Sequence, residues 1–199
     1  MEDRSLYLDP DWDAPLDVDA HLAAVPPAAM TKGMFFSRIL DDYRERYITA
    51  PTSERYVGFK DYPLRDWMEL AVSAARDLWP QKPLREGLRR VGQRAYVTFT
   101  ASFIGRVLFG VLGNNFESVV RISPRAYELA LTLARAEVIE AGAGSSAGSS
   151  ILWLRNVYNF IDCYHVGVVE GAVRACNRSG RVRLRPVSLS EAYFLLEWW

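Results

Sequence analysis

The chain has 199 residues, enough for one domain with a sizeable hydrophobic core. It is 50% hydrophobic and 24% charged with a formal net charge of zero, which is typical of a globular protein. The balanced charge argues against a dedicated nucleic-acid-binding domain, and no apolar run reaches the roughly 18 residues that span a bilayer.

The N-terminal residues and the two cysteines indicate the cellular compartment of the protein. The N-terminus, Met-Glu-Asp-Arg, lacks the basic and then apolar pattern of a signal peptide, so we expect a cytoplasmic protein. Cys163 and Cys176 would lie about 20 Å apart on one helix, whereas a disulfide needs Cα atoms within about 7 Å. We therefore expect two reduced, buried thiols.

The sequence divides into an acidic N-terminal arm, residues 1–30, and a single α+β domain, residues 31–199. Seven acidic residues stand against one basic residue in the first 20 positions of this arm. Asp17 or Asp19 would cap a short helix that ends before Pro26-Pro27. The apolar side chains of the arm are sufficient for docking on the domain, and a solvated, disordered arm is an equal alternative.

Helical periodicity recurs through the first half of the domain. Asp61 is a suitable N-cap for one helix, with Pro63 in its first turn and Pro80 at its end. Another helix starts after Pro83. Further helices are expected over residues 33–46, 103–112, 116–121 and 124–128.

The pattern changes to strands in the second half. Residues 129–140 and 150–158 are compatible with strands, although part of the first segment also tolerates a helix. The small residues of 141–150 between them are typical of a mobile hairpin loop. A helix and two strands, near 181–187 and 192–198, complete the chain. We therefore predict an α+β fold in which a helical layer packs on a C-terminal antiparallel sheet of about four strands.

Gly167 and Gly171 lie four residues apart, on one face of the helix that precedes the last two strands. Glycines inside a helix cost about 1 kcal/mol each relative to alanine. We interpret both as packing glycines and expect their face to lie close to the sheet.

Only two histidines are present, His21 and His165, and no cluster near His165 completes a four-ligand set, so no metal site is predicted. Acid–base chemistry and packing at the start of a helix are both open roles for His165, and we favour packing. Cys163 is a weak partner for it, because residues two apart on a helix do not face each other. The sequence also lacks a GxxxxGK[ST] loop and a Gly-x-Ser-x-Gly elbow, and it indicates no reaction.

Arg181, Arg183 and Arg185 alternate and so share one face of a strand. They indicate either a solvated sheet face covered by the acidic arm or a surface for a partner or an anion. Trp198 and Trp199 point to opposite faces of the last strand, so at least one is exposed unless something covers it. We therefore group Trp199 with the three arginines as partner-binding candidates.

Several motifs, in their order along the chain, resemble a large myxobacterial paralogous family of unknown function. They are Gly33-Met-Phe-Phe, Asp61-Tyr-Pro-Leu, Leu88-Arg-Arg-Val-Gly92, the Gly105-to-Phe109 segment, Val166-Gly-Val-Val-Glu-Gly171 and a terminal Tyr-x-x-x-x-Trp. Residues 59–199 are more distantly similar to heme nitric-oxide-binding sensors, 4-vinyl reductase domains and small TRAPP subunits. That resemblance implies helices on an antiparallel sheet with an apolar cavity between them, and sensing, hydrophobic-ligand binding or assembly in place of catalysis.

The sequence differs from these families at the positions where their cofactors bind, so the same cofactors are not expected in this chain. The segment around 116–128 has no histidine where the heme sensors have their proximal ligand, and the Tyr-x-Ser-x-Arg motif is absent. The cysteines that 4-vinyl reductase domains carry near the last strand pair are also missing, beyond Cys176. Neither heme nor a metal is therefore predicted.

We predict a non-enzymatic small-molecule sensor or signalling domain with an apolar pocket between helices and sheet; in the alternative, the aromatic rings simply fill that space. The ligand-binding candidates are Trp67, Phe103, Trp153, His165 and Phe194. The alternative function belongs to a different class: a protein-interaction or assembly module that uses the three arginines and Trp199. A homodimer is one form that such a module could take. An enzyme centred on His165 and Cys163 is the third hypothesis.

Overall fold

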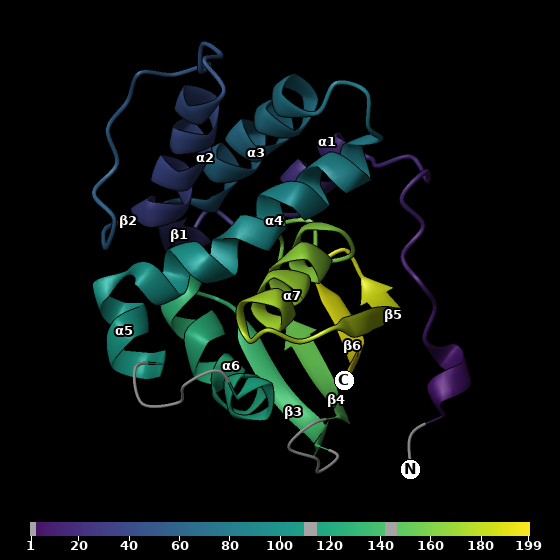
Figure 1. Cartoon of the computed structure of the whole chain (residues 1–199). Helices are drawn as coiled ribbons and strands as arrows, with labels where there is room; N and C mark the ends of the chain where they lie inside the picture. Colours follow the sequence, from purple (N-terminus) through teal and green to yellow (C-terminus); the bar gives the residue numbers. More distant parts are fainter. Residues whose placement is uncertain (1–2, 110–114, 142–146) are drawn as a thin grey trace.

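The computed structural model describes residues 3–109, 115–141 and 147–199 and confirms the α+β fold (Figure 1). Its α-helices are α1 (Val18–Ala23), α2 (Gly33–Glu45), α3 (Leu64–Leu78), α4 (Leu84–Ala101), α5 (Phe103–Phe109), α6 (Phe116–Ala130) and α7 (Tyr164–Ala175), after a short 3-10 helix, η1 (Arg4–Leu6). Its strands are β1 (Met30–Lys32), β2 (Asp61–Pro63), β3 (Arg135–Ala141), β4 (Gly148–Arg155), β5 (Gly180–Ser188) and β6 (Glu191–Trp198). Within the described ranges, no helix is both long and apolar enough to cross a membrane.

The large sheet has the strand order β3-β4-β6-β5, with every neighbouring pair antiparallel. Side chains alternate between its two faces. Leu152 of β4 pairs with Phe194 of β6, which pairs with Leu184 of β5, and all three belong to the main core on the helical side. Ile151 and Leu195 are buried in a separate small cluster on the opposite face, which we call the outer face. Helices α6 and α7 lie on the inner face, and α4 packs across α7 (Figure 1).

A second, two-stranded sheet was not predicted. Strands β1 and β2 pair antiparallel, and Lys32 forms an ion pair with Asp61 at 2.7 Å. Asp61 is therefore a strand residue and not the N-cap of α3, whose cap position is Pro63 without a side-chain hydrogen bond. Strands of three residues are too short to show a readable alternation of apolar side chains, which explains why the sequence did not reveal them.

Helix α6 corrects the expectation of two short helices and a strand that begins at 129. It runs unbroken through Pro124 and ends at Ala130. A proline inside a helix leaves the carbonyl four residues earlier without its backbone donor. That carbonyl belongs to Val120, and the hydroxyl of Ser123 donates to it at 2.7 Å. The parts of the expected 103–112 helix and 141–150 loop at 110–112 and 142–146 lie outside the described residues.

Gly167 and Gly171 face α4 and not the sheet, contrary to the prediction. A Cβ atom on Gly167 would overlap the carbonyl oxygen of Arg89, and one on Gly171 would overlap that of Gln93. Gly92 of α4 likewise lies against the backbone of α7. The spacing of the glycines correctly indicates a shared close-packed face, but it does not say which neighbour approaches that face.

The described part of the N-terminal arm is docked on the domain. Asp17 caps α1 by accepting a hydrogen bond from the Ala20 amide at 2.9 Å, as the sequence indicated. Leu8 exchanges two backbone hydrogen bonds of 2.8 Å with Leu184, and Asp9 forms an ion pair with Arg181. The arm therefore lies along the edge of β5 before it reaches α1 (Figure 1).

Candidate ligand-binding site

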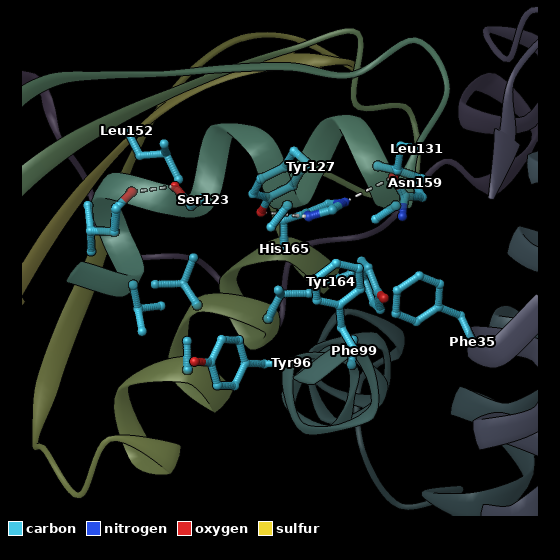
Figure 2. A pocket seen from close by; sticks show the side chains of 18 of the residues that line it. Phe35, Tyr96, Phe99, Ser123, Tyr127, Leu131, Leu152, Asn159, Tyr164 and His165 are labelled. Atoms are coloured by element: carbon cyan, nitrogen blue, oxygen red, sulfur yellow. Dashed lines mark hydrogen bonds between the residues drawn. The ribbon is translucent and has the colours of Figure 1, made fainter. Parts of the chain in front are cut away.

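A cavity of about 100 Å³ lies between helices α4, α6 and α7 and the inner face of the sheet (Figure 2). Aromatic and aliphatic side chains from five elements form most of its wall: Phe35 from α2, Phe99 from α4, Phe116 and Val120 from α6, Val169 from α7, and Leu152 from β4. Each of these elements reaches the cavity with the apolar face that its sequence period places toward the core.

A buried chain of three polar side chains crosses this apolar wall. The hydroxyl of Tyr127 on α6 lies 3.1 Å from Nδ1 of His165 on α7, and Nε2 of His165 lies 2.9 Å from Oδ1 of Asn159 (Figure 2). Because the Asn159 oxygen only accepts, Nε2 carries the imidazole proton, and Nδ1 accepts from the Tyr127 hydroxyl. The arrangement fixes His165 as a neutral ring with both nitrogens engaged.

Burial keeps these groups uncharged at neutral pH. It lowers the pKa of His165 from 6.5 to about 3, because the imidazolium form has no solvent or anionic partner there. Burial also raises the pKa of the Tyr127 and Tyr164 phenols far above the ordinary value. None of the described residues that line the cavity is an aspartate, glutamate, lysine or arginine. The site is therefore a neutral, mostly apolar space.

Of the five predicted ligand-binding residues, the structure places only His165 on the wall of this cavity. Trp67 is buried on α3 behind the wall, where its ring meets that of Tyr164 with 4.7 Å between centroids. Phe103 is 75% exposed on α5, because the apolar run that contains it extends past the core.

The two predicted residues from the sheet lie elsewhere. Trp153 is on the outer face, stacked on Tyr193 with 5.2 Å between ring centroids. Phe194 is on the inner face and fully buried, but it packs in the core beside the cavity and does not line it. Residues 153 and 194 belong to opposite faces because the register pairs Leu152, and not Trp153, with Phe194.

The arginine candidates share the outer face, as their alternation predicted, and each contacts another part of the chain. Arg181 pairs with Asp9 of the arm, and Arg183 pairs with Glu197 of β6 at 3.1 Å. The guanidinium of Arg185 lies 4.1 Å from the centroid of the Tyr193 ring. Trp199 is 60% exposed.

Sequence reasoning missed Tyr127, Asn159 and Tyr164 as cavity residues. Asn159 lies in the loop between β4 and α7, where Asn156 and Phe160 both have positive φ, at 56° and 55°. These two turns place Asn159 beside the first turn of α7. The signal that would have found it is a polar residue between Tyr158 and Phe160, shortly before the helix that carries His165.

The structure does not join Cys163 to His165. The Cys163 thiol is buried 3.8 Å from the carbonyl oxygen of Phe160, and burial raises its pKa well above the ordinary value. Within the described part of the chain, no three histidine, cysteine or acidic side chains gather in a way that would hold a metal ion.

Solved structures with a similar fold include several H-NOX proteins. The Fe(II) unliganded H-NOX protein from K. algicida is 15% identical with a TM-score of 0.61, over 84% of this chain and 96% of that one. An H-NOX protein from S. oneidensis in the Fe(II)NO ligation state is 13% identical with a TM-score of 0.58, over 84% and 99% of the two chains. An oxygen-binding H-NOX domain related to soluble guanylate cyclases is 13% identical with a TM-score of 0.58, over 84% of this chain and 93% of that one.

At these identities the likeness is one of fold, so the chain has an H-NOX-like architecture, in agreement with the distant resemblance seen in the sequence. Residues 24–199 match a family described as proteins of unknown function, DUF2378, and the chain belongs to this family. No curated protein matches the chain in sequence.

Proposed function

We propose that this protein is a non-enzymatic domain that senses a small molecule bound in the cavity between α6, α7 and the sheet. The observation that carries the proposal is the cavity itself, about 100 Å³ with a nearly continuous apolar wall. Close-packed interiors leave few voids larger than a water molecule. In another protein, an engineered apolar cavity of about 150 Å³ stays dry and binds benzene or xenon. The sensor role is supported by the fold, since similar structures include an oxygen-binding domain related to guanylate cyclases.

The described residues around this cavity do not fit a heme, the group that the fold would imply. Heme iron is held by histidine, cysteine, methionine or tyrosinate side chains. The only histidine on the wall, His165, has both nitrogens in hydrogen bonds, and burial keeps Tyr127 and Tyr164 protonated. No described lining residue is a cation that would pair with propionates, and pockets for larger ligands have volumes of about 300–1,000 Å³. We therefore propose a sensor without heme.

The proposal that the domain is not an enzyme rests on the state of its reactive groups. His165 is a neutral imidazole whose two nitrogens are both engaged, and the Cys163 thiol is held protonated by burial. Nucleophilic catalysis needs a nucleophile within hydrogen-bond reach of a base. In the described residues, these two side chains do not form that pair.

Thermal and chemical denaturation with apolar probes tests the proposed function. We expect benzene or methylenecyclopentane to stabilise the fold, by about 2.7 kcal/mol at 100 times the dissociation constant. Ala126→Leu, which places a larger side chain on the cavity wall, should fold and lose this stabilisation. Hemin should give no stoichiometric Soret band. No stabilisation by either probe, or a sharp Soret band abolished by His165→Ala, would contradict the proposal.

A second candidate function is a protein-interaction module, which the exposure of Trp199 favours. The three outer-face arginines support it less, because each contacts another part of the chain. Native mass spectrometry distinguishes the two functions. A dimer in the absence of ligand that Trp199→Ala dissociates would support the interaction module, and a monomer that retains an apolar compound would support the sensor.

A further inference from the structure

We infer that the ligand of the cavity is a neutral molecule of about six non-hydrogen atoms with one hydrogen-bond acceptor, which the Tyr164 hydroxyl and the Asn159 amide are placed to bind. This inference rests on the proposed function and adds the chemical class of the ligand. It follows from the open hydrogen-bonding capacity of two buried side chains, from the absence of charge on the described wall and from the size of the cavity.

Two polar side chains that line the cavity have hydrogen-bonding capacity that the described residues leave open. Tyr164 is 4% exposed and Asn159 is 3% exposed. Asn159 uses its oxygen to accept from His165, which leaves the two N–H donors of its amide nitrogen. In the described part of the chain, no group forms a hydrogen bond with that nitrogen or with the Tyr164 hydroxyl. Neither atom is completely shielded from a water-sized probe, so an acceptor on a ligand in the cavity can reach a donor that the protein leaves open.

The charge of the wall selects a neutral ligand. The described lining residues include no lysine or arginine that would compensate an anion and no carboxylate that would compensate a cation. Burying an unpaired charge costs far more than burying a hydrogen-bonded neutral group. Both open groups donate hydrogen bonds, so the matching functional group is a ketone, aldehyde or ether oxygen, and a carboxylate or phosphate is excluded.

The volume sets the size of the ligand. The cavity of about 100 Å³ is smaller than the roughly 150 Å³ that accommodates benzene elsewhere. Benzene has six non-hydrogen atoms, so about six such atoms are the upper limit here, and a ligand of that size requires a small rearrangement of the side chains on the wall.

Two probes of matched shape test the acceptor. Cyclopentanone and methylenecyclopentane share a five-membered ring and differ by an exocyclic oxygen in place of a CH₂ group. Titration calorimetry should show cyclopentanone binding about tenfold more tightly, the effect of one net hydrogen bond. Butanoate has the same number of non-hydrogen atoms and carries a charge, and it should bind at least about a hundredfold more weakly than cyclopentanone.

Single hydroxyl deletions locate the contact. Tyr164→Phe removes a hydroxyl without a described partner, so it should fold and keep its affinity for methylenecyclopentane. Its preference for cyclopentanone should be reduced, because only the Asn159 amide remains as a donor. Tyr96→Phe is the matched control, because that hydroxyl also belongs to a lining tyrosine but is hydrogen-bonded to the Cys176 thiol. The control should retain the tenfold preference.

The outcomes separate this inference from the proposed function. Three results would overturn the inference: equal affinity for the two ring probes, tighter binding of butanoate than of cyclopentanone, or a ketone preference that Tyr164→Phe does not reduce. Equal affinity for the two rings would leave a sensor of purely apolar molecules. Failure of both ring probes to bind the wild-type protein would overturn the proposed function itself. The comparison of probes on the wild-type protein stays decisive if Tyr164→Phe does not fold.

Discussion

Helix α7 has two faces that are packed in opposite ways. Toward α4, Gly167 and Gly171 bring the two backbones so close that a methyl group does not fit. Toward α6 and the sheet, His165 and Ala172 border a cavity. Backbone contacts cannot adjust without moving a whole helix, whereas side chains around a void can rearrange. The difference teaches that α7 is fixed on the α4 side and adjustable on the cavity side, which is where we expect a ligand to act.

The largest expected effect comes from breaking the tight face. Gly167→Ala places a Cβ atom on the Arg89 carbonyl oxygen, and neither backbone can yield cheaply. We expect it to lower the free energy of unfolding by about 3 kcal/mol, the upper end for overpacking. Urea denaturation provides the measurement. Gly58→Ala is the control, because its Cβ would lie 3.7 Å from the Cβ atom of Met34, an ordinary contact. If both variants were as stable as the wild type, the two helices would be free to separate.

The next effect concerns the cavity face and depends on pH. The pKa of His165 is about 3 in the folded chain and near 6.5 in the unfolded chain. Below about pH 6.5 the unfolded state therefore takes up a proton that the folded state does not bind, so the stabilising contribution is present at higher pH and is lost as the pH falls toward 3. We expect about 2 kcal/mol lower stability at pH ~5 than at pH ~8.

His165→Gln should remove most of this dependence. Burial lowers the pKa of His21 too, so His21→Gln is the matched control and should flatten the curve less. Denaturant titrations at several pH values measure both slopes. An unchanged slope in His165→Gln would show that water reaches the imidazole in the folded protein.

A smaller and opposite effect is expected from filling the void. Ala126→Leu adds three carbon atoms on the cavity wall of α6, and we expect it to stabilise the fold by about 1 kcal/mol. The same change at Ala71, fully buried on α3 and away from the cavity wall, should destabilise the fold by about 1–3 kcal/mol through overpacking. Equal destabilisation by the two substitutions would mean that the cavity is no more adjustable than the rest of the core.

The smallest effect is expected at Asp9 of the arm. Asp9→Asn removes an exposed ion pair with Arg181, and such pairs contribute little to stability. We expect no measurable change in the unfolding transition but faster amide exchange at Leu184, whose N–H donates to Leu8 of the arm. Asp13→Asn is the control and should leave that exchange unchanged. Unaltered exchange in Asp9→Asn would show that the Leu8 bridge holds without the ion pair.

The order of the major helices and of the four C-terminal strands was predictable, because long segments carry a clear period of apolar side chains. The residues of the ligand-binding cavity were much harder to predict from the sequence. The alternation correctly grouped Arg181 with Arg183, but it could not tell that Trp153 shares their outer face, since this depends on register between strands. The glycines of α7 indicated close packing, and only the fold shows that α4 is the neighbour.

The polar part of the cavity depends on contacts between distant segments. Tyr127 and His165 are 38 positions apart, and their hydrogen bond forms only after α6 and α7 pack together. Asn159 is placed by two loop residues with positive φ, Asn156 and Phe160. Asparagine often adopts this conformation and phenylalanine rarely does, so the sequence indicates the first turn but not the second. Local propensity therefore located the helices but not the polar groups that they bring together.

The two hydrogen bonds between Leu8 and Leu184 have a consequence for the behaviour of the protein at high concentration. Strand β5 is at the edge of the sheet, and an open edge presents backbone groups that can recruit a strand from another molecule. The arm occupies part of this edge and places the negative charge of Asp9 beside it. Proteolytic loss of the arm would therefore open this edge and also uncover Ile151 and Leu195, which Tyr7 of the arm helps to bury. Light scattering during storage would detect the aggregation of the clipped protein.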